Sequence, residues 1–534
     1  MGKRQQGRGQ ERKQKKYQTR RQAQTTSITK WAVLFSALIL AMAGAIYLNA
    51  LKDEQSSSKL ELPLDTSNPE PSINWSNYPT ENIILQNSLE ITRSGSYRLT
   101  GTLEDGIIDI NIPHGQVKLI LDGVTINHSS GPVILCRDAE TLVIELVGVN
   151  TIEDGHTYLT DYGDEINGTI YSEADLYFQG DGELDITANY LDGIVGKKSI
   201  VFNGGTYKIK AEDDGIRGKD SVRIADGNYI INASANAIKA TNDQEIGEGY
   251  IQIENGDFDI NSGNKGIKSA NTIIIHGGEF SIKSYDDAIH SDSLIGITGG
   301  IISINAGDDA IYANRRLIVD GGKIVVARAK EGLEAQAITI NDGYLQIIAI
   351  DDGINASGGD ETDEKKNTVF NETEELNLSI NGGYIYVDAA GDGLDSNGWI
   401  NINGGKIIID GPTNDKNGAL DATMGMIIHG GEVVAVGSSK MAQEFDLASS
   451  IYSTSIYLDS VYPAGTKFEI RSQAGDTIME LTTKKTCDYI IIASPNLIFG
   501  EKYALYIDDE FHQDFIILGN GRAAQGLLET TTTF

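Results

Sequence analysis

The chain has 534 residues, 60 of them glycine, few aromatic residues and a formal net charge of −33. This composition favours a large all-β body over a mixed α/β domain, and so acidic a body excludes nucleic acid as a partner. The charge is uneven, because residues 1–30 carry ten basic residues and one acid, which leaves 33 basic and 75 acidic residues in the rest. A body so rich in carboxylates suits calcium, which takes several oxygen ligands.

The first 74 residues are expected to lie outside the folded body. Residues 1–30 are basic and rich in glutamine, which predicts a disordered cytoplasmic tail. Residues 31–51 are almost wholly apolar and long enough to span a bilayer, and the basic flank before them keeps the tail inside. We therefore expect a single-pass anchor with an extracellular body. A cleaved signal peptide, followed by secretion, is the alternative, because Ala41-Met42-Ala43 offers a small-residue cleavage site. Residues 52–74 form a linker with several serines and prolines.

A repeat of 22 residues organises the chain after the linker. The sequence DDAIHS at 286–291 recurs as DDAIYA at 308–313, and turn glycines recur at the same interval in Gly256, Gly278, Gly300 and Gly322. Strands at this period, with no room for helices, predict a β-solenoid whose coils stack roughly 4.8 Å apart. Since parallel crossovers are right-handed as a rule, the expected fold is all-β, a right-handed parallel β-helix of about a dozen coils.

The β-helix is expected over residues 75–440. Residues 242–248, 357–375 and 412–417 are polar insertions into regular coils, and the acidic insertion 357–375 has no role that the sequence indicates. Past Met441 the glycine phase is lost, so residues 441–534 are predicted to form a small C-terminal β cap or module. No pattern in the sequence indicates the oligomeric state.

One strand of each coil carries the motif D-D-[GA]-I-x-[AGS]. The isoleucine and the small residue point inward, so the residue between them faces out, and stacked copies form an outward column. The members of the outward column are Val195, Arg217, Lys239, Lys268, His290, Tyr312, Glu334, Asn355, Asp395 and Asp421.

Part of the outward column is predicted to bind a polysaccharide. The rung spacing of roughly 4.8 Å is close to the length of one sugar, so a glycan chain along the axis meets one side chain per residue. The predicted binding residues are Arg217, Lys239, Lys268, His290 and Tyr312. Ordinary outward residues of a strand are the alternative interpretation.

Pairs of aspartates precede the outward column. Four carboxylates within two rungs are costly as bare anions, and a hard cation with oxygen ligands relieves that cost. We predict calcium at Asp286, Asp287, Asp308 and Asp309, with Asp213, Asp214, Asp351 and Asp352 as further candidate ligands. Asp-Gly turns, in which the aspartate bonds its own backbone, are the alternative.

Several motifs carry a family resemblance. They are GSYRLTG at 95–101, LILDGVTI at 119–126, EDG at 153–155, the repeated DDGI, GKD at 218–220 and YIIIASP at 489–495. Together they resemble a family of bacterial cell-surface carbohydrate-binding proteins first recognised in cellulose-degrading clostridia. The resemblance covers residue 75 to the C-terminus. It implies a right-handed parallel β-helix similar to pectate lyases, bound calcium, and the binding of cellulose and acidic, pectin-like sugars rather than their cleavage.

Three functions compete at this point. The first is a membrane-anchored, non-catalytic protein that holds acidic or cellulose-like polysaccharide on a calcium-bearing face. The second is a calcium-dependent, pectate-lyase-like polysaccharide lyase, with Lys239, Lys268 or Arg217 as the base. The third is a structural or adhesive surface protein in which the aspartates only rigidify the solenoid. The first is favoured, and enzymatic activity is left undecided with the balance against it.

Overall fold

The computed structural model describes residues 73–163, 165–357, 376–521 and 524–525. The chain divides into two units, Met1–Leu62 and Pro63–Phe534, and all described residues belong to the second. The predicted tail, anchor and most of the linker, as well as nearly all of the insertion 357–375, lie outside them. Within the described part of the chain no helix is long and apolar enough to span a membrane.

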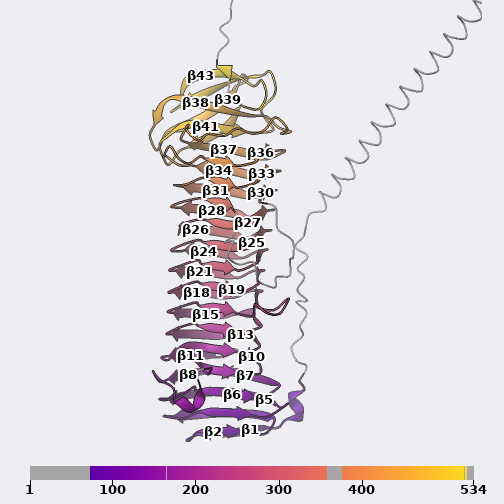
Figure 1. Ribbon diagram of the computed structural model, residues 1–534, viewed down its shortest axis with the longest axis vertical. Coiled ribbons are helices and arrows are strands. Elements are labelled where there is room, and N and C mark those ends of the chain that lie inside the picture. Colours follow the sequence, from indigo (N-terminus) through magenta and orange to yellow (C-terminus); the bar gives the residue numbers. More distant parts are fainter. Residues whose placement is uncertain (1–72, 164, 358–375, 522–523, 526–534) are drawn as a thin grey trace, which may run out of the picture. The chain divides into compact units, whose positions relative to one another are not determined.

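The second unit is an all-β parallel solenoid of about 15 turns (Figure 1). Its described helices are two single 3-10 turns, η1 (Trp75–Asn77) and η2 (Thr160–Tyr162). Every strand pair between Gly205 and Gly405 is parallel, as predicted. The turns outnumber the dozen expected, because the coils before Ile170 stack in the same way although their turns lack the regular glycine phase.

Each coil contributes strands to three ladders. The first ladder comprises β1 (Thr80–Leu85), β3 (Gly95–Leu103), β5 (Gln116–His128), β7 (Thr141–Val147), β10 (Asp175–Gln179), β13 (Ser199–Ala211), β15 (Ser221–Ala233), β17 (Tyr250–Ile253), β20 (Thr272–Ile275), β23 (Leu294–Ile297), β25 (Ile311–Val319), β27 (Leu333–Ile340), β30 (Asn377–Ile380), β33 (Trp399–Ile402) and β36 (Gly425–Ile428). Some of these strands run across a corner and join two ladders, which is why β13 pairs with both β10 and β11.

The second ladder continues from the corner-crossing strands with β8 (Val149–Asp154), β11 (Glu183–Ala188), β18 (Asp257–Ser262), β21 (Glu279–Ser284), β24 (Ile301–Asn305), β26 (Lys323–Ala329), β28 (Tyr344–Ala349), β31 (Tyr384–Ala389), β34 (Lys406–Asp410) and β37 (Glu432–Gly437). The third ladder carries the outward column. Besides the first residues of β25 and β27, it comprises β2 (Leu89–Ile91), β4 (Ile108–Asn111), β6 (Ile134–Asp138), β9 (Gly168–Ser172), β12 (Asp192–Gly196), β14 (Ile216–Gly218), β16 (Ile238–Ala240), β19 (Ile267–Ser269), β22 (Ile289–Ser291), β29 (Ile354–Ala356), β32 (Leu394–Ser396) and β35 (Leu420–Ala422).

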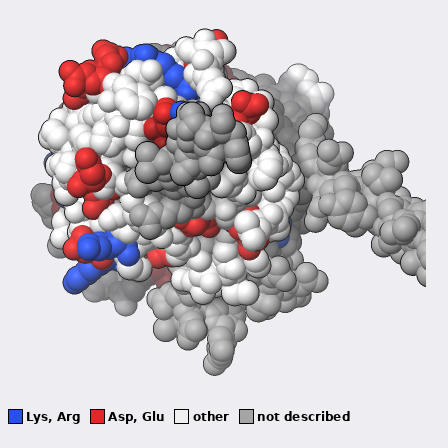
Figure 2. Space-filling view, turned by 90° about the horizontal axis from the view of Figure 1, so that it is seen from above, with Lys and Arg blue, Asp and Glu red and all other residues white. Residues whose placement is uncertain are grey.

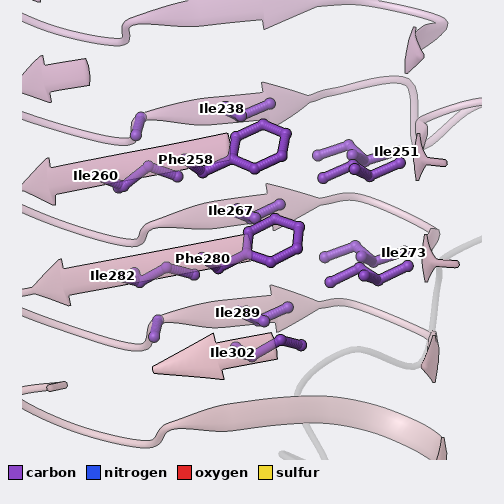
Figure 3. Close-up of a cluster of buried hydrophobic side chains, with 14 of the residues drawn as sticks. Ile238, Ile251, Phe258, Ile260, Ile267, Ile273, Phe280, Ile282, Ile289 and Ile302 are labelled. Carbon is purple, nitrogen blue, oxygen red and sulfur yellow. The ribbon is translucent and has the colours of Figure 1, made fainter. Parts of the chain in front are cut away.

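The core is a set of identical or similar side chains stacked from coil to coil. Ile267 and Ile289 are fully buried on successive strands, and the Phe258 and Phe280 rings stack at 4.5 Å (Figure 3). Stacking of this kind buries an apolar face that no single coil can bury alone. The turn glycines have a separate cause. Gly278 has a φ of +101°, and a Cβ there would lie 2.8 Å from the Gly256 carbonyl oxygen.

The C-terminal end of the solenoid is closed by antiparallel strands. β41 (Cys487–Ala493) pairs antiparallel with β37 and with β38 (Ser453–Tyr462), which covers the edge that the last coil would otherwise expose. A second antiparallel sheet follows, made of β39 (Lys467–Ser472), β40 (Thr477–Thr482), β42 (Lys502–Ile507), β43 (Glu510–Ile516) and β44 (Ala524–Gln525). Seen from above in the view of Figure 1, most of the visible described surface is uncharged, with small separate groups of acids and bases (Figure 2).

Candidate functional site

The outward column occupies consecutive rungs of the third ladder. Arg217 pairs in register with Lys239, Lys239 with Lys268, Lys268 with His290, and His290 with Tyr312. The register continues through Glu334, Asn355, Asp395 and Asp421. The structure therefore brings the five predicted binding residues side by side, because each occupies the same position in its own coil and the coils stack in register.

A second column lies at the corner before the third ladder. This corner column, one residue per coil, consists of Asp192, Asp214, Asn236, Lys265, Asp287, Asp309, Glu331, Asp352 and Asp392. Except for Asp309, its aspartates use Oδ1 to accept a backbone N–H from the next coil, as when Asp192 accepts from Asp214 N at 2.9 Å and Asp287 from Asp309 N at 3.1 Å. One oxygen of these carboxylates therefore supports the corner, and the other remains for a cation.

Ion pairs between the two columns explain how like charges stack in the outward column. The Arg217 guanidinium lies 2.8 Å from Asp192, and the Lys239 ammonium lies 2.9 Å from Asp214. The next residue of the corner column is Asn236, an amide. Lys268 therefore has no carboxylate at the position where Asp192 serves Arg217 and Asp214 serves Lys239. No hydrogen bond or ion pair joins the Lys268 ammonium to any residue that the structure describes.

The Asp286–Asp287 pair already has polar partners within the protein. Lys265 Nζ lies 2.8 Å from Asp286 and 2.7 Å from Asp287, and His290 Nδ1 lies 2.7 Å from Asp287 Oδ2. Burial raises the pKa of Asp287, but the hydrogen bond from His290 and the Lys265 charge outweigh it and hold that pKa below its usual value. His290 Nε2 lies 2.9 Å from Asp292, and its ring stacks on Tyr312 at 4.8 Å.

Asp309 is drawn into a different carboxylate group from the one predicted. Oxygens of Asp309, Glu331 and Glu334 lie within 4.8 Å of one another, whereas Asp286, Asp287 and Asp308 form a group of their own. Asp309 is 5% exposed, and its Oδ1 is buried without a hydrogen-bond partner. Burial and the neighbouring carboxylates raise the pKa values of Asp309 and Glu331. A bound cation would supply positive charge to this group and a partner for Asp309 Oδ1.

A further carboxylate group lies toward the C-terminal end of the same two columns. It consists of Asp352, Asp392 and Asp395, with oxygens again within 4.8 Å of one another. Burial, followed by charge repulsion within the group, raises the pKa of Asp392 to about 7 and that of Asp395 to about 6. Three converging carboxylates are a donor set suited to a hard divalent cation.

Of the other four predicted ligands, Asp213, Asp214 and Asp352 belong to a carboxylate group and Asp351 does not. Asp213 and Asp214 converge with Asp192, but Arg217 and Lys239 already pair with Asp192 and Asp214. Asp351 belongs to none of the four groups among the described residues. The prediction omitted Asp192, Glu331, Glu334, Asp392 and Asp395. These five residues could have been found by considering the corner and outward columns together. Each carboxylate group takes members from adjacent coils, and two of the four groups take members from both columns.

Comparison with known proteins places this site in a family context. The model of the carbohydrate-binding domain-containing protein family matches residues 86–332, 282–376 and 308–478, and the chain belongs to that family. A carbohydrate-binding domain-containing protein of Acetivibrio thermocellus is 31% identical over 133 residues, which are 24% of this chain and 46% of the relative. The chain thus spans just under half the length of that relative.

Among solved structures, a gadolinium derivative of the polysaccharide lyase-like protein from C. thermocellum is similar to part of the chain. Its sequence is 27% identical, the TM-score is 0.37, and the match covers 45% of this chain and 96% of that protein.

Proposed function

We propose that the protein is a non-catalytic, extracellular polysaccharide-binding protein whose outward column holds acidic, pectin-like or cellulose-like chains. The observation that carries this proposal is the unbroken register from Arg217 to Tyr312 on one ladder of a rigid solenoid. Rungs at roughly 4.8 Å offer one side chain per sugar to a chain lying along the axis. Membership of a carbohydrate-binding family supports the general role.

Each side chain has a distinct task in this proposal. The Lys268 ammonium, which pairs with none of the described residues, is placed to meet a uronate carboxylate, and Arg217 and Lys239 add positive charge beside it. The His290–Tyr312 stack offers an aromatic surface to a sugar face. Calcium would be held by Asp309, Glu331 and Glu334, where Lys330 Nζ lies 3.8 Å from Glu331, and by Asp352, Asp392 and Asp395. Bound there, calcium would neutralise the group and bridge a uronate to the protein.

Residues 31–51 would tether this body to the outside of the membrane, as their apolar length indicates. Binding of polygalacturonate and cellulose to residues 75–534, measured with and without a chelator, tests the proposal. Calcium-dependent retention of polygalacturonate is expected. Retention of neither glycan would leave the structural or adhesive role.

A lyase is the second candidate, and one feature favours it. Lys268 has no acidic partner among the described residues and lies on the rung between Lys239 and His290, where a general base would face a sugar bound along the column. Formation of unsaturated product from polygalacturonate, followed by ultraviolet absorbance, separates this candidate from the first. The binding role predicts no product.

A further inference from the structure

The outward column is closed at its N-terminal side. Leu135, Tyr171 and Val195 occupy outward positions of β6, β9 and β12, yet they are 0%, 1% and 1% exposed. Tyr162 and Ile166, from the segment between β8 and β9, pack over them. A glycan lying along the column therefore meets a wall beyond Arg217.

A small pocket lies at this closed end. Its volume is about 190 Å³, and its lining includes Val195, Lys197, Arg217, Lys219, Asn242 and Gln244. Pockets for drug-sized ligands begin at about 300 Å³, so this one fits about one sugar ring. Three of its lining residues are cations and one, Asp243, is an acid whose Oδ1 accepts a hydrogen bond from Gln244 Nε2, so basic side chains outnumber acidic ones in the lining.

The polar insertion 242–248 builds one side of the pocket. Asn242 is buried, donates to Asp220 Oδ1 at 2.8 Å, and accepts the backbone N–H groups of Gln244 and Glu245. Gly249 N donates to the Asp220 carbonyl oxygen, which ties the end of the insertion to the same residue. The insertion is therefore held in a defined shape beside Lys219.

The cations of the pocket retain capacity for an anion. Arg217 Nε is buried and has no hydrogen-bond partner, although the guanidinium pairs with Asp192 through Nη2. Lys219 is exposed, and its ammonium pairs with no residue that the structure describes. Lys197 Nζ lies 5.9 Å from the Tyr171 ring centre and likewise has no acidic partner there. An arginine donor buried without a partner costs free energy unless a ligand satisfies it.

From these observations we infer that the pocket is an end subsite, which takes the terminal uronate of an acidic glycan and sets where the chain stops on the outward column. This inference rests on the proposed function and adds to it the recognition of a chain end. The carboxylate of the terminal sugar meets Arg217 and Lys219, and the wall over Val195 prevents the chain from running on.

The test compares trigalacturonate with polygalacturonate. The double variant Lys197→Ala with Lys219→Ala is measured by calorimetry against a control of equal charge change, Lys210→Ala with Lys283→Ala, two exposed lysines of the second ladder. We expect the pocket variant to lose at least tenfold in affinity for the trimer while its melting temperature stays unchanged. The control should bind as the wild type does.

Chain-end recognition has its own readout. When polygalacturonate is shortened at constant mass, competition for the trimer site should rise with the number of chain ends, and inorganic phosphate at equal concentration should not displace the trimer. Equal trimer affinity in the pocket variant, competition that follows mass alone, or displacement by phosphate overturns the end subsite, while polymer binding by the wild type leaves the proposed function standing. Failure of the wild type to bind either glycan overturns both.

Discussion

At the scale of single residues, the aspartates of the corner column serve the backbone and the surface at once. Asp214 accepts from Asn236 N with Oδ1 and pairs with Lys239 through Oδ2. The prediction treated turn support and cation binding as alternatives, whereas the structure combines them in one carboxylate. The cation then differs by coil, being Arg217, Lys239 or Lys265 where a basic side chain reaches the acid.

Calcium should depend on Asp309 more than on Asp287. We expect calcium to raise the melting temperature of the wild type, by an amount equivalent to about 2.7 kcal/mol at 100 times its Kd. Asp309→Asn together with Glu334→Gln should remove that gain, because it removes two of three converging carboxylates. Asp287→Asn should retain it, since Asp287 already pairs with Lys265 and is hydrogen-bonded to His290. Differential scanning fluorimetry with calcium or chelator measures this.

The control for that series is Asp259→Asn, an exposed aspartate of β18 on the second ladder, which should behave as the wild type. Without calcium, the Asp309 variant should be no less stable than the wild type, because burial and the neighbouring carboxylates already disfavour the charged form of Asp309. A calcium response that survives in the Asp309 variant would contradict the assignment.

Stability without calcium should fall as the pH rises. Asp392 and Asp395 bind protons more tightly in the folded state, with pKa values of about 7 and about 6 against an ordinary value of 3.8. Their contribution to folding is therefore fully present below pH 4 and is lost progressively as the pH rises through 7. The gain in melting temperature from calcium should be larger at pH 8 than at pH 5, since the metal needs ionised ligands.

Asp392→Asn with Asp395→Asn should flatten this pH dependence, and Asp257→Asn, at an exposed aspartate of the second ladder, should not. Melting curves at several pH values in chelator provide the measurement. A melting temperature in chelator that rises from pH 5 to pH 8 through these two residues would show that the sign is wrong.

At the scale of strands and coils, the period decides which side of each strand is buried. The sequence predicted the ladder register and the inward isoleucines, because both follow from a 22-residue spacing and from alternation along a strand. It did not predict that the oxygens of Asp309 would converge with those of Glu331 and Glu334, because this grouping depends on side-chain positions that the repeat does not specify. Handedness remains a prediction from the general rule for parallel crossovers.

Two isoleucines on neighbouring strands test the inward and outward assignment. Ile289 on β22 is 0% exposed, and Ile301 on β24 is 48% exposed. Ile289→Ala should lower the free energy of unfolding by about 2–5 kcal/mol, because it opens a cavity in the stacked core. Ile301→Ala should change it by less than about 0.5 kcal/mol. Chemical denaturation measures both, and equal losses would contradict the assignment.

At the scale of the whole molecule, charge is sorted along the two columns of one corner. From Arg217 to Lys268 the outward column is basic, although Arg217 and Lys239 pair with aspartates of the corner column. From Asp309 to Asp395, two carboxylate groups draw members from both columns. In the proposed function, an acidic polymer would meet fixed cations along one part of the ladder and bound calcium along the next. The outward column could be predicted from the sequence but the wall over Val195 could not, because that wall comes from a segment outside the repeat.

Binding of polygalacturonate by outward-column variants tests whether this column holds the glycan. Lys268→Ala, alone and combined with Lys239→Ala, is compared with the wild type and with Lys210→Ala plus Lys283→Ala, in calcium and at two salt concentrations. We expect affinity lower by about three- to tenfold in the double variant, an unchanged control, and weaker wild-type binding in higher salt. Polygalacturonate binding that is unchanged in the double variant, with its melting temperature intact, would show that the outward column does not hold the glycan.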